Sequence, residues 1–271
     1  MTTGATPTAP VGPASAGAAT LAAAAGAPRI PIAITRQKTS KSRLKIRWDY
    51  PVYKPEALAK LDWETVSVQP DKALPREEAF RAIAKDDPRP LLILRECQAC
   101  VGSEVALLST SAENDRTLLL ARWFHCVKLP PDVLREDHPF RHVFPEEEPP
   151  HLLLARRDGS SAIPLSGAQS QGDLWDSMHA ALRADYAKDP EKAVNEILKL
   201  LAHYDALDGQ IVLQEDRLDE AIEKEGPDSS KARSIRKDIQ RLEKEKKEAL
   251  AREEKAADLG LKVASPAAPA R

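Results

Sequence analysis

Short apolar runs and amphipathic helical patterns alternate along the chain between residues 63 and 186. Runs of β-forming residues, some alternating with polar positions and some continuous, predict strands. These runs are Trp63–Val68, Leu91–Leu94, Phe124–Leu129, His151–Arg156 and Ser161–Leu165. The run Leu91–Leu94 has no polar position, which is typical of a central strand covered on both faces.

Helical patterns separate these strands. The expected helices run from Pro75 to about Asp87, from Cys97 to about Leu108, from Ser111 to Ala121 and from Gln171 to Tyr186, with a short one near Asp132–Arg135. The resulting order, β-α-β-α-β-α-β-β-α, predicts the α/β class and a mixed sheet flanked by helices on both faces. The last two strands are expected to be antiparallel, because the two-residue turn Asp158-Gly159 permits no other arrangement.

A long helical region follows, over residues 189–261. Asp189-Pro190-Glu191 combines an N-cap, a first-turn proline and a first-turn acid, and Gly226-Pro227-Asp228 interrupts the pattern. Two helices joined by one short breaker predict an antiparallel α-helical hairpin, or coiled coil. Its apolar seam favours a homo-oligomer or a protein partner through residues 189–261; the alternative is an extended helical appendage.

The remaining segments are compositionally distinct. Residues 1–35 are rich in Ala and Pro and predict a disordered tail, as do residues 262–271. The N-terminal segment lacks the basic start and the leucine-rich stretch of a secretory signal. Residues 36–62 carry a basic stretch, which we interpret as a solvated linker or an edge strand rather than a nucleic-acid contact.

Charge and cysteine content narrow the function classes. The chain has 40 basic and 42 acidic residues, so its net charge of −2 does not favour nucleic acid as a partner. No apolar run approaches the ~18 residues of a membrane span, and we expect a cytoplasmic protein. Three cysteines in 271 residues do not make a disulfide scaffold.

The candidate chemistry is a C-x-x-C motif, Cys97-Gln98-Ala99-Cys100, directly after the predicted central strand. At the start of the following helix, unpaired N–H groups and the helix dipole stabilise a thiolate, which can exchange disulfides. Zinc binding by such a pair normally needs a second Cys or His pair. The remaining cysteine, Cys126, is expected to be buried and inert, with a third redox thiol as the alternative.

Histidines offer no strong metal site at the sequence level. His138 and His142 are four residues apart, a spacing that could form a metal pair on a helix. Pro139 between them argues against a helix, so we predict no metal site and no cofactor. Cys97 and Cys100 would be the co-ligands if one formed.

The region 63–186 resembles the thioredoxin-like family. The resemblance rests on the strand followed by the C-x-x-C motif, on the segment from Pro150 to Gly159, and on Gly167-Ala168 before the last helix. It implies that Cys97 is the exposed nucleophile and Cys100 the more buried resolving thiol. It also implies that Pro150 forms a cis peptide beside the pair and shapes the substrate groove.

Four features, at five positions, depart from the family pattern. Glu96 replaces a tryptophan before the first cysteine, and Gln98-Ala99 replaces Gly-Pro between the two cysteines. Leu91 stands where the family has a buried acid, and Pro149 has no N–H to offer to a bound peptide. These departures leave the fold intact but affect general reductase activity.

Two functions of different class follow. The first is a thiol-disulfide oxidoreductase or redox sensor of narrow substrate range, with protein thiols or disulfides as partners and Cys97, Cys100 and Pro150 as site residues. The second is a non-catalytic thioredoxin-like interaction module, with the coiled-coil arm as a docking or dimerisation element.

Overall fold

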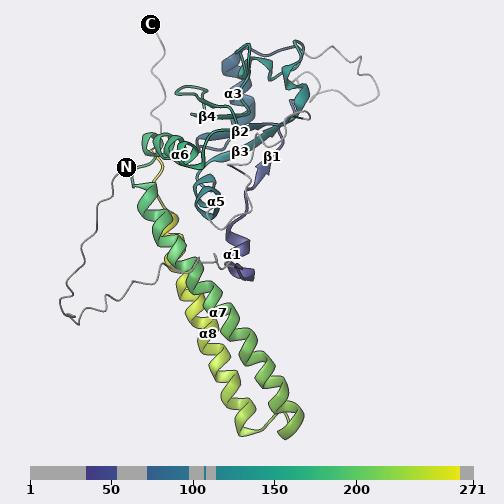
Figure 1. Ribbon diagram of the computed structural model, residues 1–271, viewed down its shortest axis with the longest axis vertical. Helices are drawn as coiled ribbons and strands as arrows, with labels where there is room; N and C mark the ends of the chain where they lie inside the picture. Colours follow the sequence, from purple (N-terminus) through teal and green to yellow (C-terminus); the bar gives the residue numbers. More distant parts are fainter. Residues whose placement is uncertain (1–34, 54–71, 98–106, 108–113, 263–271) are drawn as a thin grey trace, which may run out of the picture. The chain divides into compact units, whose positions relative to one another are not determined.

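A mixed sheet carries the candidate site. The computed structural model describes residues 35–53, 72–97, 107 and 114–262. Within these residues the sheet has five strands, in the order β1-β3-β2-β4-β5 (Figure 1). They are β1 (Trp48–Asp49), β2 (Leu91–Arg95), β3 (His125–Leu129), β4 (Leu152–Ala155) and β5 (Ile163–Leu165). Strands β1 and β2 run parallel to β3, whereas β4 is antiparallel to β2 and β5 is antiparallel to β4.

The helices correspond well to the predicted patterns. They are α1 (Lys38–Arg43), α3 (Arg76–Ala84), α5 (Asp115–Ala121), α6 (Gln171–Asp185), α7 (Pro190–Glu225) and α8 (Ser230–Ala257), with short 3₁₀ turns η3 (Pro131–Leu134) and η4 (Arg141–Val143). The start of α6 is capped by Ser170, whose hydroxyl accepts a hydrogen bond from the Asp173 N–H.

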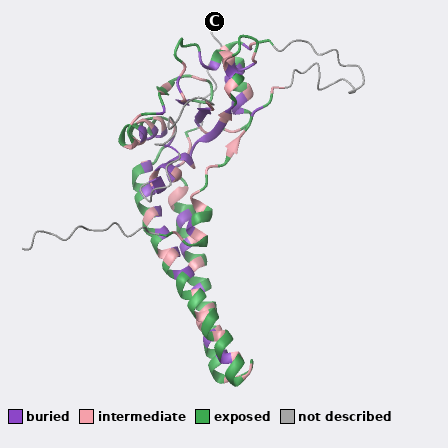
Figure 2. Ribbon diagram, turned by 45° about the vertical axis from the view of Figure 1, so that its right-hand side comes forward, coloured by how far each residue is buried: buried purple, intermediate pink, exposed green. Residues whose placement is uncertain are grey.

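Side chains of successive strand residues enter two separate cores, one on each face of the sheet. On β2, Leu92 and Leu94 pack with α5, α6 and the first half of α7, whereas Leu91 and Ile93 pack with α3 and with aromatic residues around η4. Figure 2 shows this buried interior. All five residues of β2 are buried, which confirms the prediction of a central strand covered on both faces.

The β4–β5 connection is centred where the sequence predicts. Leu152 pairs with Leu165 and Leu154 with Ile163, so Asp158 and Gly159 lie at the middle of the connection. Gly159 has a φ of +79°, a conformation that glycine adopts without steric cost. A side chain there would also overlap the buried Phe80 ring. The antiparallel pairing is confirmed, but the expected two-residue turn is wrong, because residues 156–162 connect the strands and the Arg156 N–H donates to the Ser160 carbonyl at 3.0 Å. Strand β5 is also shorter than the expected Ser161–Leu165.

The basic segment before residue 54 contributes more to the fold than a solvated linker would. Residues 38–43 form α1, which the sequence pattern did not predict, and β1 is an edge strand paired with β3. Arg36 is largely buried and forms ion pairs with Asp115 and Asp205, at 2.8 and 2.7 Å. The solvated interpretation is therefore wrong for Arg36, and the sheet begins before residue 63.

Several predictions fall outside the described residues. They concern the strand Trp63–Val68, the helix that follows Cys97, the Ser111 cap and the tails 1–34 and 263–271.

Two long helices follow α6. Asp189 caps α7 through its side chain, Ser229 caps α8, and residues 226–229 connect the two helices. The Tyr204 hydroxyl donates to the Ala249 carbonyl at 3.1 Å, and Lys246 pairs with Asp208 at 2.8 Å, so contacts run in opposite directions along the two helices. Near the connection most side chains are exposed (Figure 2). No helix in the described ranges combines the length and apolarity needed to cross a bilayer.

Candidate functional site

Cys97 lies two residues beyond the end of the central strand β2. The Glu96 N–H donates to the Leu129 carbonyl at 2.9 Å, so β3 still holds the chain in place immediately before the cysteine. Cys97 is half-buried and disulfide-bonded. Cys100, the other cysteine of the motif, lies outside the described residues. The observed part of the site is therefore the strand end and the first cysteine.

The register of β2 against β4 brings Pro149 and Pro150 to the same end of the sheet. Leu94 pairs with Leu152, and the Arg95 N–H donates to the His151 carbonyl at 2.8 Å. Extending this antiparallel register places Pro150 opposite Glu96 and Pro149 opposite Cys97. The proximity of Pro150 to the cysteine motif, which the resemblance implies, thus agrees with the strand pairing.

The expected cis peptide at Pro150 is absent. None of the described peptide bonds is cis, so the bond between Pro149 and Pro150 is trans and that expectation is wrong. Even before proline, a trans bond is favoured by about 0.5–1 kcal/mol. Here Pro150 is buried and leads directly into the extended strand β4, and no tight turn at this point imposes the less stable isomer.

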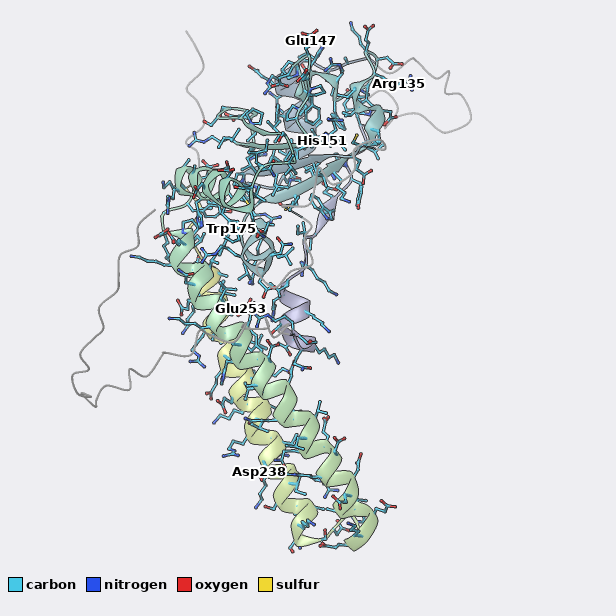
Figure 3. All side chains as sticks on the ribbon, viewed as in Figure 1. Arg135, Glu147, His151, Trp175, Asp238 and Glu253 are labelled. Atoms are coloured by element: carbon cyan, nitrogen blue, oxygen red, sulfur yellow. The ribbon has the colours of Figure 1, made fainter. Side chains whose placement is uncertain are left out.

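Arg95 fixes the two prolines. Its side chain is buried, and its Nε donates to the Pro150 carbonyl at 3.1 Å while Nη2 donates to the Pro149 carbonyl at 2.9 Å. The Nδ1 of His151 lies 3.4 Å from the same Nη2 (Figure 3). Among the described residues no carboxylate pairs with Arg95, and burial lowers the pKa of its guanidinium. A buried cation whose described partners are all uncharged acceptors or a histidine ring therefore lies two residues before Cys97.

Glu96 and Arg95 have different surroundings. The Glu96 carboxylate lies 3.4 Å from the Lys128 Nζ on β3, and Lys128 also lies over the Trp48 ring, 5.3 Å from its centroid. The ion pair between Glu96 and Lys128 is partly exposed to solvent, so its contribution to stability is small. The acidic charge beside Cys97 is thus partly offset by Lys128, while no acid in the described ranges offsets the Arg95 charge.

Leu91 confirms one departure from the family pattern. It is fully buried in the core against α3 and offers no carboxylate to accept a proton.

The sequence-based prediction for Cys126 is also confirmed as far as burial is concerned. Its thiol is free and donates to the Ala121 carbonyl at 3.3 Å, and burial raises its pKa to about 12. At neutral pH Cys126 therefore carries no thiolate.

The histidines do not form a metal site in the described part of the chain. His142 lies in η4 and its Nδ1 is 2.7 Å from the Leu74 carbonyl, whereas the His138 Nδ1 accepts from the Phe140 N–H. In the described ranges no three His, Cys, Asp or Glu side chains come together as metal ligands.

One polar cluster was not anticipated from the sequence. The Nε2 of His125 on β3 lies 3.1 Å from the Asp49 Oδ2 on β1, and Lys85 Nζ lies 2.7 Å from the same oxygen. Burial would raise the pKa of Asp49, but the hydrogen bonds from Lys85 and His125 outweigh it and hold the pKa below its usual value. Asp49 and His125 are far apart in the sequence and the parallel pairing of β1 with β3 brings them together, while Lys85 reaches Asp49 from the end of α3.

Comparison of the chain with protein-family models, with curated proteins and with solved structures gives no match. The functional argument therefore rests on the residues themselves.

Proposed function

We propose that this protein is a thioredoxin-like thiol-disulfide oxidoreductase or redox sensor that uses Cys97 and Cys100 on a narrow range of protein substrates. The observation that carries the proposal is the position of a disulfide-bonded Cys97 directly beyond the central strand β2, next to a buried Arg95 that has no acidic partner among the residues the structure describes. The mixed strand order, with the antiparallel β4–β5 pair at one edge, is compatible with the family resemblance.

The proposed reaction starts from the dithiol form. The Cys97 thiolate attacks one sulfur of a substrate disulfide, forming a mixed disulfide and releasing the other substrate sulfur as a thiolate, which takes up a proton. The Cys100 thiolate then attacks the Cys97 sulfur and releases the second substrate thiol. The protein becomes the disulfide and loses two electrons, and the substrate disulfide becomes two thiols.

The surroundings of Cys97 favour selectivity over general reduction. The Arg95 cation stabilises negative charge near the strand end, as a thiolate requires. The Leu91 side chain supplies no proton acceptor for the resolving thiol, and Pro149 supplies no N–H to a bound peptide. A partner must therefore be bound by other contacts, which restricts the range of substrates.

Trapping of the mixed disulfide tests this mechanism. Cys100→Ser is expected to accumulate a covalent adduct when the reduced protein meets a small peptide disulfide, because the resolving thiol is gone. Cys97→Ser is expected to form no adduct. Intact-mass spectrometry under non-reducing conditions measures both.

Cys126→Ser is the matched control, because it also removes one thiol but from a buried position. It should behave as the wild type. Equal adduct formation by Cys97→Ser and Cys100→Ser would contradict the assigned roles of the two cysteines.

A second candidate function is supported by two exposed apolar residues on α7. Val212 and Leu213 on α7 are about half exposed, at 55% and 50%, on a segment where most neighbouring side chains are in solvent. Under this alternative the protein is a non-catalytic interaction module, and α7 and α8 form an antiparallel hairpin that docks a second copy or a protein partner. Sedimentation equilibrium of wild type and of Val212→Ser/Leu213→Ser decides whether these residues hold an oligomer.

A further inference from the structure

A basic cavity lies at the opposite end of the sheet from Cys97. Arg89 precedes β2 and Phe124 precedes β3, so the cavity lies at the amino ends of these parallel strands, whereas Cys97 follows the carboxyl end of β2. Its volume is about 350 Å³, at the lower end of the range for small-molecule sites. Its lining comes from three separate parts of the chain: Ser42–Arg47, Arg89 and Ala121–Cys126.

The wall of this cavity is strongly cationic. Its charged lining residues are Arg43, Lys45, Arg47, Arg89 and Arg122, and among the described residues no Asp or Glu lines it. Two carboxylates behind the wall compensate part of this charge. Asp87 pairs with Arg89 at 2.6 Å, and Glu253 pairs with Arg122 at 2.5 Å and with Arg43 at 3.5 Å.

The remaining cations are available to a ligand. Lys45 and Arg47 are exposed, and no carboxylate in the described ranges lies within ion-pair distance of either. The Nε of Arg43 forms no hydrogen bond but lies 3.5 Å from the Glu253 carboxylate, so the charge of Arg43 is partly compensated. The charges of Lys45 and Arg47 are therefore the ones that an anion in the cavity would neutralise.

The floor of the cavity is apolar. It is formed by Ala121, Phe124 and Cys126, which are at most 3% exposed, with Ile46 at the side. The Cys126 thiol is protonated at neutral pH, so it adds no negative charge. The Arg122 carbonyl, which would repel an anion, is already bonded to Arg89 Nη1 at 3.0 Å.

We propose that this cavity binds a small phosphate ester, with the phosphate held by Arg43, Lys45 and Arg47 and the apolar part of the ester against Phe124 and Ile46. Arginine and lysine bind phosphate through charge-assisted hydrogen bonds, and a recess with an apolar floor suits an organic phosphate better than a bare ion. A recess of this size accommodates a small molecule, whereas a nucleic-acid strand needs an extended groove with stacking aromatic residues.

Calorimetric titration of the full chain with phenyl phosphate and with inorganic phosphate tests the proposal. We expect phenyl phosphate to bind more tightly than inorganic phosphate, because only the ester has an apolar part. Lys45→Gln/Arg47→Gln is expected to weaken phenyl phosphate binding by about tenfold or more, since two phosphate partners are lost. Both side chains are exposed, and thermal unfolding verifies that the variant is folded.

Lys237→Gln/Lys247→Gln on α8 is the matched control. It removes the same charge from exposed positions outside the cavity and is expected to leave binding within about twofold of the wild type. Equal weakening by the two double variants would overturn the proposal, because it would show only a general charge effect. Absence of phenyl phosphate binding, or equal binding of the two phosphates, would overturn it as well. Tighter binding of a short oligo-deoxythymidine that is lost in Tyr50→Ala would assign the surface to nucleic acid instead.

Discussion

At the scale of single residues, burial determines which polar groups can react. Arg95 and Cys126 are both buried, at 7% and 3% exposure, but they differ in charge. Arg95 remains a cation because a guanidinium keeps its proton at neutral pH even where burial lowers its pKa, and two carbonyls accept its hydrogen bonds. Cys126 remains neutral because burial raises its pKa from a usual value of 9.0 to about 12. Cys126, which is buried and protonated, therefore differs in its chemistry from Cys97, which is half-buried and disulfide-bonded.

The Cys126 pKa also has a consequence for stability. Between pH 9 and 12 the unfolded chain releases the thiol proton while the folded chain retains it. This contribution to stability is fully present below about pH 9 and is lost as the pH rises toward 12.

Alkylation distinguishes Cys126 from the motif cysteines. With the protein fully reduced, iodoacetamide at about pH 8 is expected to leave Cys126 unmodified, because its thiol is protonated and inaccessible. Peptide mapping by mass spectrometry measures the extent of modification at each cysteine. Labelling in urea serves as the control and should reach all three sites. Modification of Cys126 in the native protein at a rate similar to that in urea would contradict its burial.

At the scale of elements, the turn between β4 and β5 depends on one glycine. Gly159 combines a positive φ with close contact to Phe80 on α3, so the turn and the helix fix each other's positions. Gly226, at the end of α7, also has a positive φ, of +88°, but has open space around it. The two glycines therefore separate the effect of backbone strain from that of packing.

Gly159→Ala is expected to destabilise the protein by about 2–3 kcal/mol, because it adds a steric overlap with a buried ring to the strain of a positive φ. Gly226→Ala is expected to cost about 1 kcal/mol, from strain alone. Urea unfolding followed by circular dichroism measures both. Equal losses in the two variants would show that the Phe80 contact does not limit this position.

The sequence predicted the elements of the sheet better than the contacts between them. The runs Leu91–Leu94 and Phe124–Leu129 are apolar enough to identify buried strands, and the Pro75 and Asp189 start signals located α3 and α7. The two-residue strand β1 lies in a segment whose alternating basic residues also fit a solvated stretch, and only pairing with β3 identifies it. The trans peptide at Pro150 differs from the expectation because that expectation came from a family resemblance and not from local chain geometry.

For the candidate site, too, the local sequence features could be predicted and the contacts between distant residues could not. The C-x-x-C motif and its place after a central strand were predictable, because both are local in sequence. The influence of the Arg95 charge on Cys97 could be expected for the same reason, but its contacts could not, since Pro149 and Pro150 lie more than 50 residues away and only the β2–β4 register brings them together. The charge compensation of Glu96 by Lys128 depends similarly on the pairing of β2 with β3.

At the scale of the whole molecule, polar contacts link the long helices to the segments around the sheet. The Thr39 N–H and hydroxyl both donate to the Asp208 carboxylate on α7, at 2.8 and 3.0 Å. The Trp123 Nε1 donates to the Ala257 carbonyl at the end of α8, at 2.8 Å. Glu253 on α8 is 1% exposed and accepts from Arg122 and from the Tyr204 hydroxyl (Figure 3). These contacts make α8 part of the folded unit around the sheet.

Glu253→Gln is expected to destabilise the protein by about 2 kcal/mol, because Arg122 and Arg43 lose their common anionic partner. The loss is below that of a fully buried pair because both arginines are about one-third exposed. Glu254→Gln, at the neighbouring exposed position, is the control and should have little effect. Urea unfolding gives both free energies, and equal values for the two variants would contradict the structural role of Glu253.

The central claim is that Cys97 and Cys100 form a redox-active pair, and one measurement tests it most directly. The purified protein is equilibrated in glutathione buffers of defined potential, and free thiols are counted by maleimide mass shift after denaturation. We predict that two labels are lost together, with a midpoint between about −120 and −270 mV, the range of exchange catalysts, while Cys126 keeps its label. Labels that persist at all three cysteines across this range, or that are lost at Cys126, would contradict the claim.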